Sequence, residues 1–415
     1  MAITSLIPIV ALGITFILII VRKVGGYNIK IWQAMLLGAI LVLVTGQIFI
    51  VDAILSINLD VMLFLFGMFV IGSAMEKSGY LSRISAFFFG RARNVDQLIL
   101  MLLFVMGMLS ALLMNDTLAI IGTPIVLGFA KRYRISTKLL LLTLAFAVTT
   151  GSVLSPIGNP QNLLVATQGG FENPFITFMQ YLFLPTMICI LIAYTFLRVF
   201  YRKEFKTLEI VDDSSTTHDN GLTRLSKISF VLVFILIIAK IALIFILPDF
   251  DFRLTYIALI ACLPVLIGSS RRVEIVHDID WETLVFFASM FILMTSVWNS
   301  GVIQFLLEDY TSLISSVPVI LFLSVTLSQV LSNVPLVALY LPLLTEASAS
   351  IASYVALAAG STIAGNMFIL GAASNVIIIQ NAERNGETIS FWEFARIGVP
   401  LTIVQLLIYV LFLGI

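Results

Sequence analysis

The chain has 415 residues, of which 60% are hydrophobic and only 11% are charged, and its mean hydropathy is +1.10. Soluble domains carry about one charged residue in four, so this composition excludes a soluble globular domain and indicates a polytopic membrane protein. The formal net charge is zero, because 23 Lys and Arg balance 23 Asp and Glu, and nothing in this balance points to nucleic acid as a partner.

Apolar segments follow one another along the chain in two sets of similar length. They lie at 3–21, 31–50, 58–76, 98–130, 139–168, 175–198, 228–247, 254–268, 281–298, 317–345, 352–382 and 397–414. The first segment lacks a basic leader and a small-residue cleavage pattern, so it is interpreted as a retained helix. The long hydrophilic stretch 201–226 is interpreted as a cytoplasmic linker between the halves 1–200 and 227–415.

The two halves resemble each other in the same order along the chain. LLMNDTLAIIGTP (112–124) resembles VLSNVPLVALYLP (330–342), and GNPQN (158–162) resembles GAASN (371–375). EKSGYL (76–81) and WNSGVI (298–303) form a third pair, and FMQYLFLP (178–185) and EFARIGVP (393–400) form a fourth. Four pairs in register, with offsets of 213 to 222 residues, predict an internal repeat.

Segments 98–130 and 317–345 are too long for one membrane crossing, and each has a polar Asn near its middle. A re-entrant hairpin would place Asn115 and Asn333 at its tip. Each half then crosses the membrane five times, so the repeats must be inverted. With both termini outside the cell membrane, every Lys and Arg except Arg253 and Lys240 falls on or near the cytoplasmic side, as the positive-inside rule requires.

The stretch LSPIGNPQNLL (154–164) interrupts an otherwise apolar segment. Pro156 and Pro160 cannot donate backbone hydrogen bonds, and Gly158 further weakens the helix. A broken backbone inside a membrane needs protein or water to satisfy its free groups, so we expect a discontinuous helix. Its half-helix N-terminus would favour anions, and its free carbonyls would suit Na⁺. The alternative is a proline kink that neighbouring helices satisfy.

The hairpin tips carry hard oxygen and amide groups, and Asp116 is the acid placed deepest in the membrane. An intramembrane carboxylate is costly and usually functional, so Asp116 either binds a cation or carries a proton. The alternative is a structural acid that caps the amides of its own hairpin. No P-loop, zinc-protease or nucleophile-elbow motif is present, so we expect a transporter rather than an enzyme. Uphill transport would then draw on an ion gradient or on a separate ATPase subunit, which nothing in the sequence indicates.

These motifs resemble the ion transporter superfamily, which includes arsenite permeases, citrate–metal symporters and divalent anion:sodium symporters. Its symporters carry Ser-Asn-Thr at two hairpin tips, to which Asn115-Asp116-Thr117 and Ser332-Asn333-Val334 are similar. Its glycine- and proline-rich breaks resemble 158–162 and 371–375, and the resemblance covers nearly the whole chain. Val334 departs from the polar third residue of the second tip.

The resemblance implies an all-α polytopic fold of two inverted repeats, each with one re-entrant hairpin and one discontinuous helix. The scaffold helices would lie within 1–76, and the hairpin and broken-helix pairs at 97–169 and 317–383. It further implies a homodimer, elevator-type movement, and Na⁺ or H⁺ as the coupling ion. The implied ion ligands are Asn115, Asp116, Gly158, Asn159, Ser332, Asn333, Gly371 and Ala372.

The same resemblance implies that the solute lies between the tips. Its implied ligands are Asn115, Thr117, Asn162, Ser332, Asn333 and Asn375. We expect a small anion or oxyanion-type solute, either arsenite-like or a carboxylate. Because no Lys or Arg accompanies the motifs, amides, hydroxyls and helix dipoles would meet its charge, which fits a neutral or singly charged solute better than citrate. The alternative is a sodium/proton antiporter in which Asp116 exchanges the two cations and no solute binds. No resident metal or cofactor is expected beyond such an ion.

Overall fold

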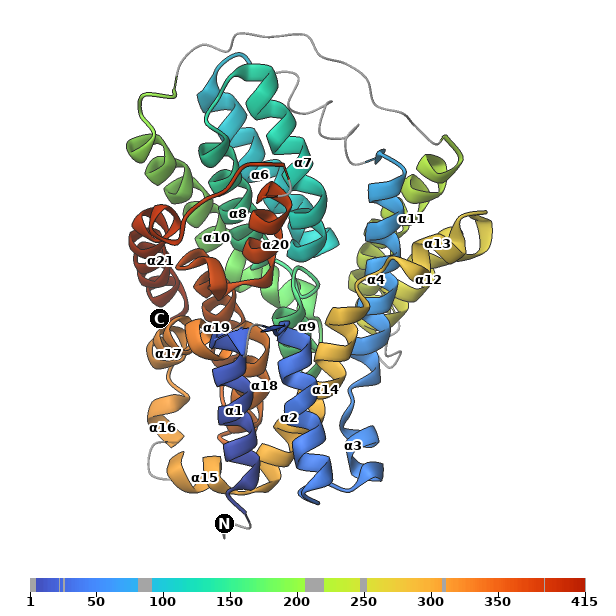
Figure 1. The fold of residues 1–415 in the computed structure, drawn as a ribbon, viewed down its shortest axis with the longest axis vertical. Helices are drawn as coiled ribbons and strands as arrows, with labels where there is room; N and C mark the ends of the chain where they lie inside the picture. Colours follow the sequence, from blue (N-terminus) through green and yellow to red (C-terminus); the bar gives the residue numbers. More distant parts are fainter. Residues whose placement is uncertain are drawn as a thin grey trace.

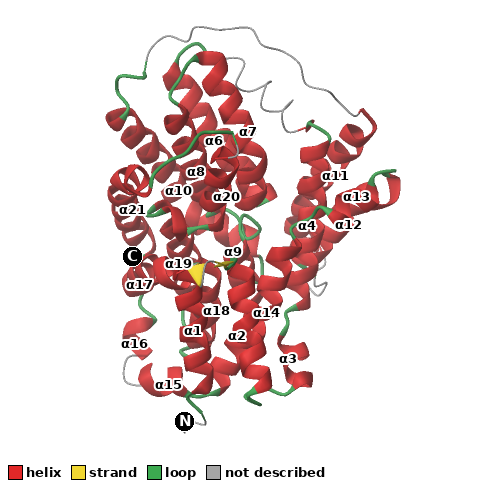
Figure 2. Ribbon diagram, viewed as in Figure 1, coloured by secondary structure: helices red, strands yellow, loops and turns green. Residues whose placement is uncertain are grey.

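Nearly every apolar segment of the sequence forms a helix in the computed structural model (Figure 2). The structure describes residues 5–21, 23–24, 27–80, 92–205, 220–246, 252–307, 311–383 and 385–414. Six of the described helices are long and apolar enough to cross a membrane, and several shorter apolar helices accompany them. The described fold is helical apart from one two-residue ladder, as the resemblance implies, and its apolar helices are consistent with the polytopic membrane protein that the composition predicts.

One group of helices, here called the scaffold group, comes from the first part of each half (Figure 1). The close pairs within it are α2 with α14, α4 with α12, and α11 with α12. A two-residue antiparallel ladder, β1 (Lys23–Val24) with β2 (Tyr27–Asn28), joins its first two helices. Its members are α1 (Ile7–Val21), α2 (Ile31–Val44), α3 (Ile50–Ser56), α4 (Leu59–Lys77), α11 (Asn220–Ile246), α12 (Leu254–Gly268), α13 (Arg272–His277) and α14 (Trp281–Asn299).

The second group, here called the hairpin group, contains the motifs. In Figure 1 the arms α6 and α7 lie in the upper half of the molecule and the arms α17 and α18 in the lower half. Short helices α15 (Val302–Leu307) and α16 (Thr311–Ile314) lead from the scaffold group into α17. Its members are α6 (Val95–Leu113), α7 (Asn115–Tyr133), α8 (Thr137–Ser152), α9 (Pro160–Gln168), α10 (Pro174–Phe200), α17 (Val317–Leu331), α18 (Asn333–Glu346), α19 (Ile351–Ile363), η2 (Ala364–Asn366), η3 (Ile369–Gly371), α20 (Ala373–Glu383) and α21 (Phe391–Leu413).

Polar side chains fix where many of these helices begin. Asn58, Asn94 and Asn173 each accept a hydrogen bond from a backbone amide in the first turn of the following helix. Ser390 does the same for α21 and forms a capping box with Glu393. Such caps satisfy amides that a helix leaves unpaired at its start, which locates the helix ends in an apolar sequence that offers few other boundaries.

One expected boundary is wrong, and one apolar segment contains the end of one helix and the start of another. Helix α11 begins at Asn220, inside the stretch 201–226 expected as a linker, because Leu222 is buried and the Thr223 hydroxyl donates to the Ser78 carbonyl (3.0 Å). Residues 206–219 of that stretch lie outside the described residues. Segment 31–50 is not one helix, because α2 ends at Val44 and Gly46 turns the chain with a φ of +69° before α3.

Several charged residues and one histidine of the loops lie where the structure gives no description. The residues Arg22, Arg83, Arg91, Lys206, His218, Asp249, Asp251, Glu308, Asp309 and Arg384 lie outside the described part of the chain. The two thiols, Cys189 in α10 and Cys262 in α12, are both buried and unbridged. Lys240 is 8% exposed, and its Nζ donates to the Phe252 carbonyl (2.5 Å).

Candidate functional site

Two helical hairpins meet near the middle of the molecule, and their tips have the same unusual backbone. One residue, Met114, separates α6 from α7, and one residue, Ser332, separates α17 from α18. Their φ values are +71° and +66°, with ψ values of 142° and 158°. This region is nearly exclusive to glycine, so both tips store backbone strain. The residue after each tip is an asparagine at a helix N-terminus, as the repeat predicts.

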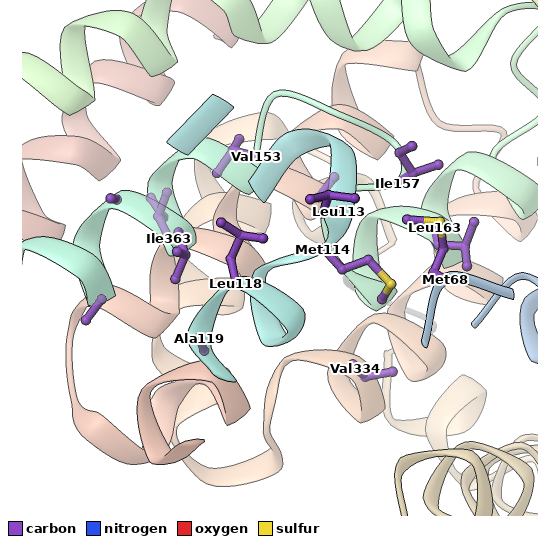
Figure 3. Packing of buried hydrophobic residues seen from close by; sticks show 14 of the residues in the cluster. Met68, Leu113, Met114, Leu118, Ala119, Val153, Ile157, Leu163, Val334 and Ile363 are labelled. Atoms are coloured by element: carbon purple, nitrogen blue, oxygen red, sulfur yellow. The ribbon is translucent and has the colours of Figure 1, made fainter. Parts of the chain in front are cut away.

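The first tip is bonded to both broken helices. The Asn115 amide N donates to the Gly158 carbonyl (2.9 Å), and its Nδ2 lies 3.5 Å from the Ser374 hydroxyl at the start of α20. Gly158 is needed for the packing of the break itself, because a Cβ at that position would lie 2.2 Å from the Ser152 carbonyl oxygen. Figure 3 shows the apolar packing around the tip, in which Leu113 and Met114 take part. The Asn115 Oδ1 is buried without a hydrogen-bond partner.

The first broken helix stops at Ser152 and resumes at Pro160, and Asn159 caps the second piece. Asn159 Oδ1 accepts from the Asn162 amide (2.8 Å), and its Nδ2 donates to the hydroxyls of Ser152 (3.0 Å) and Thr362 (3.2 Å). Pro160 occupies the first helical position, where its missing N–H costs nothing. Both functional groups of the Asn159 amide are therefore occupied by protein.

Asn162 satisfies the backbone that the break exposes. Its Nδ2 lies 3.0, 3.3 and 3.0 Å from the carbonyl oxygens of Ser152, Val153 and Ser155. Its Oδ1 accepts from the Thr362 hydroxyl (3.1 Å). The side chains of Asn159 and Asn162 are fully buried. They hold the broken helix together, and Gln161 between them is the amide that lines the central cavity described below.

The second break, at 364–372, consists of the 3₁₀ turns η2 and η3, although this stretch contains no proline. Asn366 Nδ2 donates to Thr150 Oγ1 (3.0 Å) and Gln405 Oε1 (2.8 Å), and Asn375 Nδ2 donates to the Gly365 carbonyl (2.5 Å). Gly371 is needed for packing, since a Cβ there would lie 2.8 Å from both the Ala364 carbonyl oxygen and Gln329 Oε1.

The two breaks differ in how completely their polar groups are paired. Thr362 and Asn162 are hydrogen-bonded, and their counterparts 213 residues away in the repeat are Thr149 and Asn375. Neither Thr149 Oγ1 nor Asn375 Oδ1 has a hydrogen-bond partner. Further buried oxygens around the second break and its tip are also unpartnered: Gln329 Oε1, Asn333 Oδ1 and Asn366 Oδ1. Buried polar atoms are normally satisfied, so this cluster suits an additional ligand.

A cavity of about 1060 Å³ lies where the tips and breaks converge, and the N-termini of four helices of the hairpin group line it, as do the starts of α2 and α14 from the scaffold group. The four from the hairpin group are the starts of α7, α9, α18 and α20, each at least nine residues long. Of the predicted residues, Asn115, Asp116, Ser332, Asn333 and Ala372 line the cavity. The remaining ones, Thr117, Gly158, Asn159, Gly371, Asn162 and Asn375, lie behind its wall; Thr117 instead approaches Gly72 of α4.

Charged residues that the sequence did not single out also line the cavity. Asp280 caps α14, accepting from the amide (3.0 Å) and hydroxyl (2.6 Å) of Thr283. Glu282 pairs with Lys30, which is the only cation among the described lining residues. These residues belong to loops and helix starts of the scaffold group, far from any repeat motif, so only the fold brings them beside Asp116.

The sequence is similar to known transporters over most of its length. The profile of a family described as citrate transporters matches residues 16–358. An uncharacterised transporter of Mycobacterium tuberculosis is 29% identical over 379 residues, covering 86% of each chain. A silicon efflux transporter of Oryza sativa subsp. japonica is 26% identical over 471 residues, covering 95% of this chain and 94% of the relative.

The fold is similar to that of a solved membrane transporter. The crystal structure of the YdaH transporter of Alcanivorax borkumensis aligns with a TM-score of 0.60, covering 98% of this chain and 95% of that one. The sequences are 16% identical, so this similarity concerns the fold alone.

Proposed function

This chain belongs to the citrate transporter family of the ion transporter superfamily, and from this premise we propose an ion-coupled secondary transporter of a small anion or oxyanion-type solute. Family and apolar helices together establish a multi-pass membrane transporter. The proposed solute is an arsenite-like inorganic species or a carboxylate. Among the relatives, the rice protein is named for silicon, and this favours the inorganic class.

The convergence of four helix N-termini on one cavity is the observation that carries this proposal. Each N-terminus carries about half a positive charge, which stabilises an anion by roughly 0.3–1 kcal/mol, although Gly158 and Asn159 already accept from one amide each at the starts of α7 and α9. Four termini together supply roughly 1–4 kcal/mol. Lys30 is already neutralised by Glu282, so this field suits a neutral or singly charged solute better than a tricarboxylate.

The coupling ion is proposed to bind beside the tips. Na⁺ prefers hard oxygen ligands, which Asn115 Oδ1 supplies at the first tip and Asn333 Oδ1 at the second. Asn159 was expected to bind the first ion, but its amide is fully hydrogen-bonded within the protein. We therefore propose that it stabilises the break and does not coordinate the ion. Around the second break, Asn375 and Gln329 add unpartnered oxygens, so the second site is proposed as the stronger one.

Alternating access is proposed to follow movement of the hairpin group against the scaffold group. Ion pairs of the described residues join helices within one group: Lys77–Glu274, Lys77–Asp278, Lys30–Glu282 and Arg253–Asp60 in the scaffold group, and Lys138–Glu393 and Arg198–Asp96 in the hairpin group. Inverted repeats with re-entrant hairpins would supply this geometry. The cavity wall includes Lys30, which the charge pattern assigns to the cytoplasmic side, so we propose an inward-open state.

The homodimer and the outward-facing termini stay predictions that accompany this proposal. A dimer would use the scaffold group, whose short helix α3 exposes four apolar side chains. Ile50, Val51, Ile54 and Leu55 are each more than 60% exposed. Either lipid or a second scaffold group would cover this face in the membrane.

A sodium/proton antiporter is the second candidate, and the surroundings of Asp116 favour it. This carboxylate lines the same cavity as Asp280, and it has no ion pair with any described residue. Two carboxylates without a dedicated cation form a site that suits Na⁺ or protons in exchange. In this case no anionic solute would be needed.

Flux through proteoliposomes tests these candidates against each other. Purified protein is reconstituted, and uptake of arsenite, silicate, phosphate, citrate and a dicarboxylate is measured with imposed Na⁺ or pH gradients. We expect uptake of one solute class that collapses when the driving gradient is removed. Asn115→Ala should abolish it, while Asn94→Ala, which removes an asparagine cap outside the cavity, should preserve it. Alkalinisation of the lumen by Na⁺ alone, with no solute flux, would establish the antiporter instead.

A further inference from the structure

A second cavity, of about 450 Å³, lies away from the candidate site, where α10 ends beside the start of α21. Residues 199–204 and Arg396 form its walls. Figure 1 shows these two helices close together in the hairpin group, at a distance from the tips. The cavity contains no residue of the proposed transport machinery.

Three cations line this cavity, and nearby carboxylates are already occupied. Arg202, Lys203 and Arg396 form no ion pair with any described residue. The one acid in the wall, Glu204, accepts from the Ser136 amide (3.3 Å). On the neighbouring turn of α21, Glu393 pairs with Lys138 (2.5 Å). The Ser136 amide is neutral and leaves the charge of Glu204 in place, but the three cations of the wall outnumber this one acid, so the cavity has a net positive charge.

The geometry of the cations suits a phosphate group. The Arg396 guanidinium lies over the Phe200 ring, with 5.3 Å from its Cζ to the ring centroid. This contact fixes one planar donor at the wall, while Arg202 and Lys203 lie on the turn that follows α10. Arginine recognises phosphate through paired N–H donors, and lysine adds a compact point charge.

The apolar surroundings indicate that the phosphate belongs to a lipid. Val199 is 64% exposed and Trp392, at the start of α21, is 78% exposed. Trp392 packs against Phe391 with 5.3 Å between ring centroids. Aromatic side chains of this kind concentrate at membrane–water interfaces, and the charge pattern assigns this end of the helices to the cytoplasmic leaflet. That leaflet carries anionic lipids, which basic pockets between helices bind.

We propose that this cavity binds the phosphate group of an anionic phospholipid of the surrounding bilayer. Free phosphate offers the same charged group, but it lacks acyl chains to cover the exposed apolar side chains beside the cavity. A lipid satisfies both parts of the surface at once. The site adds a bound lipid to the hairpin group and is independent of the transported solute.

Lipid titration of the full-length protein in detergent tests the proposal. Retention by native mass spectrometry and the unfolding temperature are measured with phosphatidylglycerol, phosphatidylcholine and inorganic phosphate. Arg202→Gln combined with Lys203→Gln is expected to weaken phosphatidylglycerol binding by roughly 30-fold, at about tenfold per 1.4 kcal/mol and roughly 1 kcal/mol per charge. The control, Lys131→Gln with Arg134→Gln, removes the same charge from the same expected side and should leave binding unchanged.

Further arms separate the sources of the phosphate and keep the result independent of folding. Both changed residues are exposed, and Arg396→Lys, which keeps the charge, should retain most of the binding. Equal affinity of the double variant and its control would overturn the site. Equal stabilisation by inorganic phosphate would overturn the lipid assignment, and so would equal stabilisation by phosphatidylcholine.

Discussion

Replacing Asn162 with alanine should destabilise the protein far more than the same change at its repeat counterpart, Asn375. Asn162 bonds three carbonyls and one hydroxyl. The Ser152 and Ser155 carbonyls keep backbone partners at 3.4 and 3.1 Å, and Thr362 Oγ1 still accepts from Asn159, so the Val153 carbonyl and the Thr362 hydroxyl proton are the two groups that lose their partner. An unpaired buried group costs about 1–3 kcal/mol, so Asn162→Ala should cost roughly 2–6 kcal/mol.

The same arithmetic gives a smaller cost for Asn375→Ala. Its Nδ2 donates to one carbonyl, that of Gly365, and its Oδ1 has no partner to lose. The cost should therefore be about 1–3 kcal/mol. Because the unpartnered Oδ1 is a proposed ion ligand, this variant should instead lose the stabilisation that Na⁺ gives.

Thermal unfolding of the two purified variants measures both effects. Each is compared with the unchanged protein in Na⁺ and in choline at equal ionic strength. We expect a lower unfolding temperature in both salts for Asn162→Ala, and loss of the difference between the salts for Asn375→Ala. Two results would refute the assignment of different roles to the two breaks. One is an equal fall in unfolding temperature for both variants, and the other is a Na⁺ stabilisation that Asn162→Ala abolishes and Asn375→Ala retains.

Other predictions test the moving interface, the carboxylate and the surface charges. Gly72→Ala should slow transport without unfolding the protein, because its Cβ would lie 2.7 Å from a methyl carbon of the first hairpin, whereas Gly13→Ala has open space and serves as control in uptake assays. Asp116→Asn should leave folding intact but abolish transport or change its coupling ion, as measured by flux and its pH dependence. The Arg271 guanidinium, with help from Lys77, lowers the pKa of Glu274 from 4.5 to about 2. The resulting stabilisation should be complete above pH 4.5 and lost as the pH falls towards 2, and unfolding temperatures of Glu274→Gln should lack this dependence.

Each of these expectations has an outcome that contradicts it. Equal uptake by Gly72→Ala and its control would show that the contact with the hairpin does not limit movement. Unaltered flux and pH dependence in Asp116→Asn would remove this residue from the coupling site. An acid-induced loss of stability that persists in Glu274→Gln would assign it to other carboxylates.

Local sequence patterns predicted most helix positions but not all boundaries. The proline and glycine content of 154–164 predicted the first break, which the structure shows between Ser152 and Pro160. The second break was harder to predict because GAASN contains no proline. The structure places this break at η2 and η3, where the Asn366 side chain donates hydrogen bonds to Thr150 and Gln405. Helix α11 begins at Asn220 because its first turns pack against α4. The polar composition of 201–226 gives no sign of this packing.

The candidate site was predictable only in outline. The tip residues Asn115, Asp116, Ser332 and Asn333 line the cavity as their positions in the repeat suggested. Asn159 and Asn162 have the same polarity, yet their amides are occupied by the break itself. Sequence alone does not distinguish an amide that faces a cavity from one that faces a carbonyl.

The sequence by itself determined the class of protein, because hydrophobic length, charge placement and the paired motifs are properties of the chain read in one dimension. Only the tertiary structure decided which polar groups remain available. Repeat partners with the same residue type, such as Asn162 and Asn375, differ because each hydrogen bond depends on the distance to its partner group. That group can lie far away in the sequence, as Thr362 lies 200 residues from Asn162. No local sequence pattern encodes such distances. For the same reason, only the fold shows that Asp280 and Lys30 line the cavity.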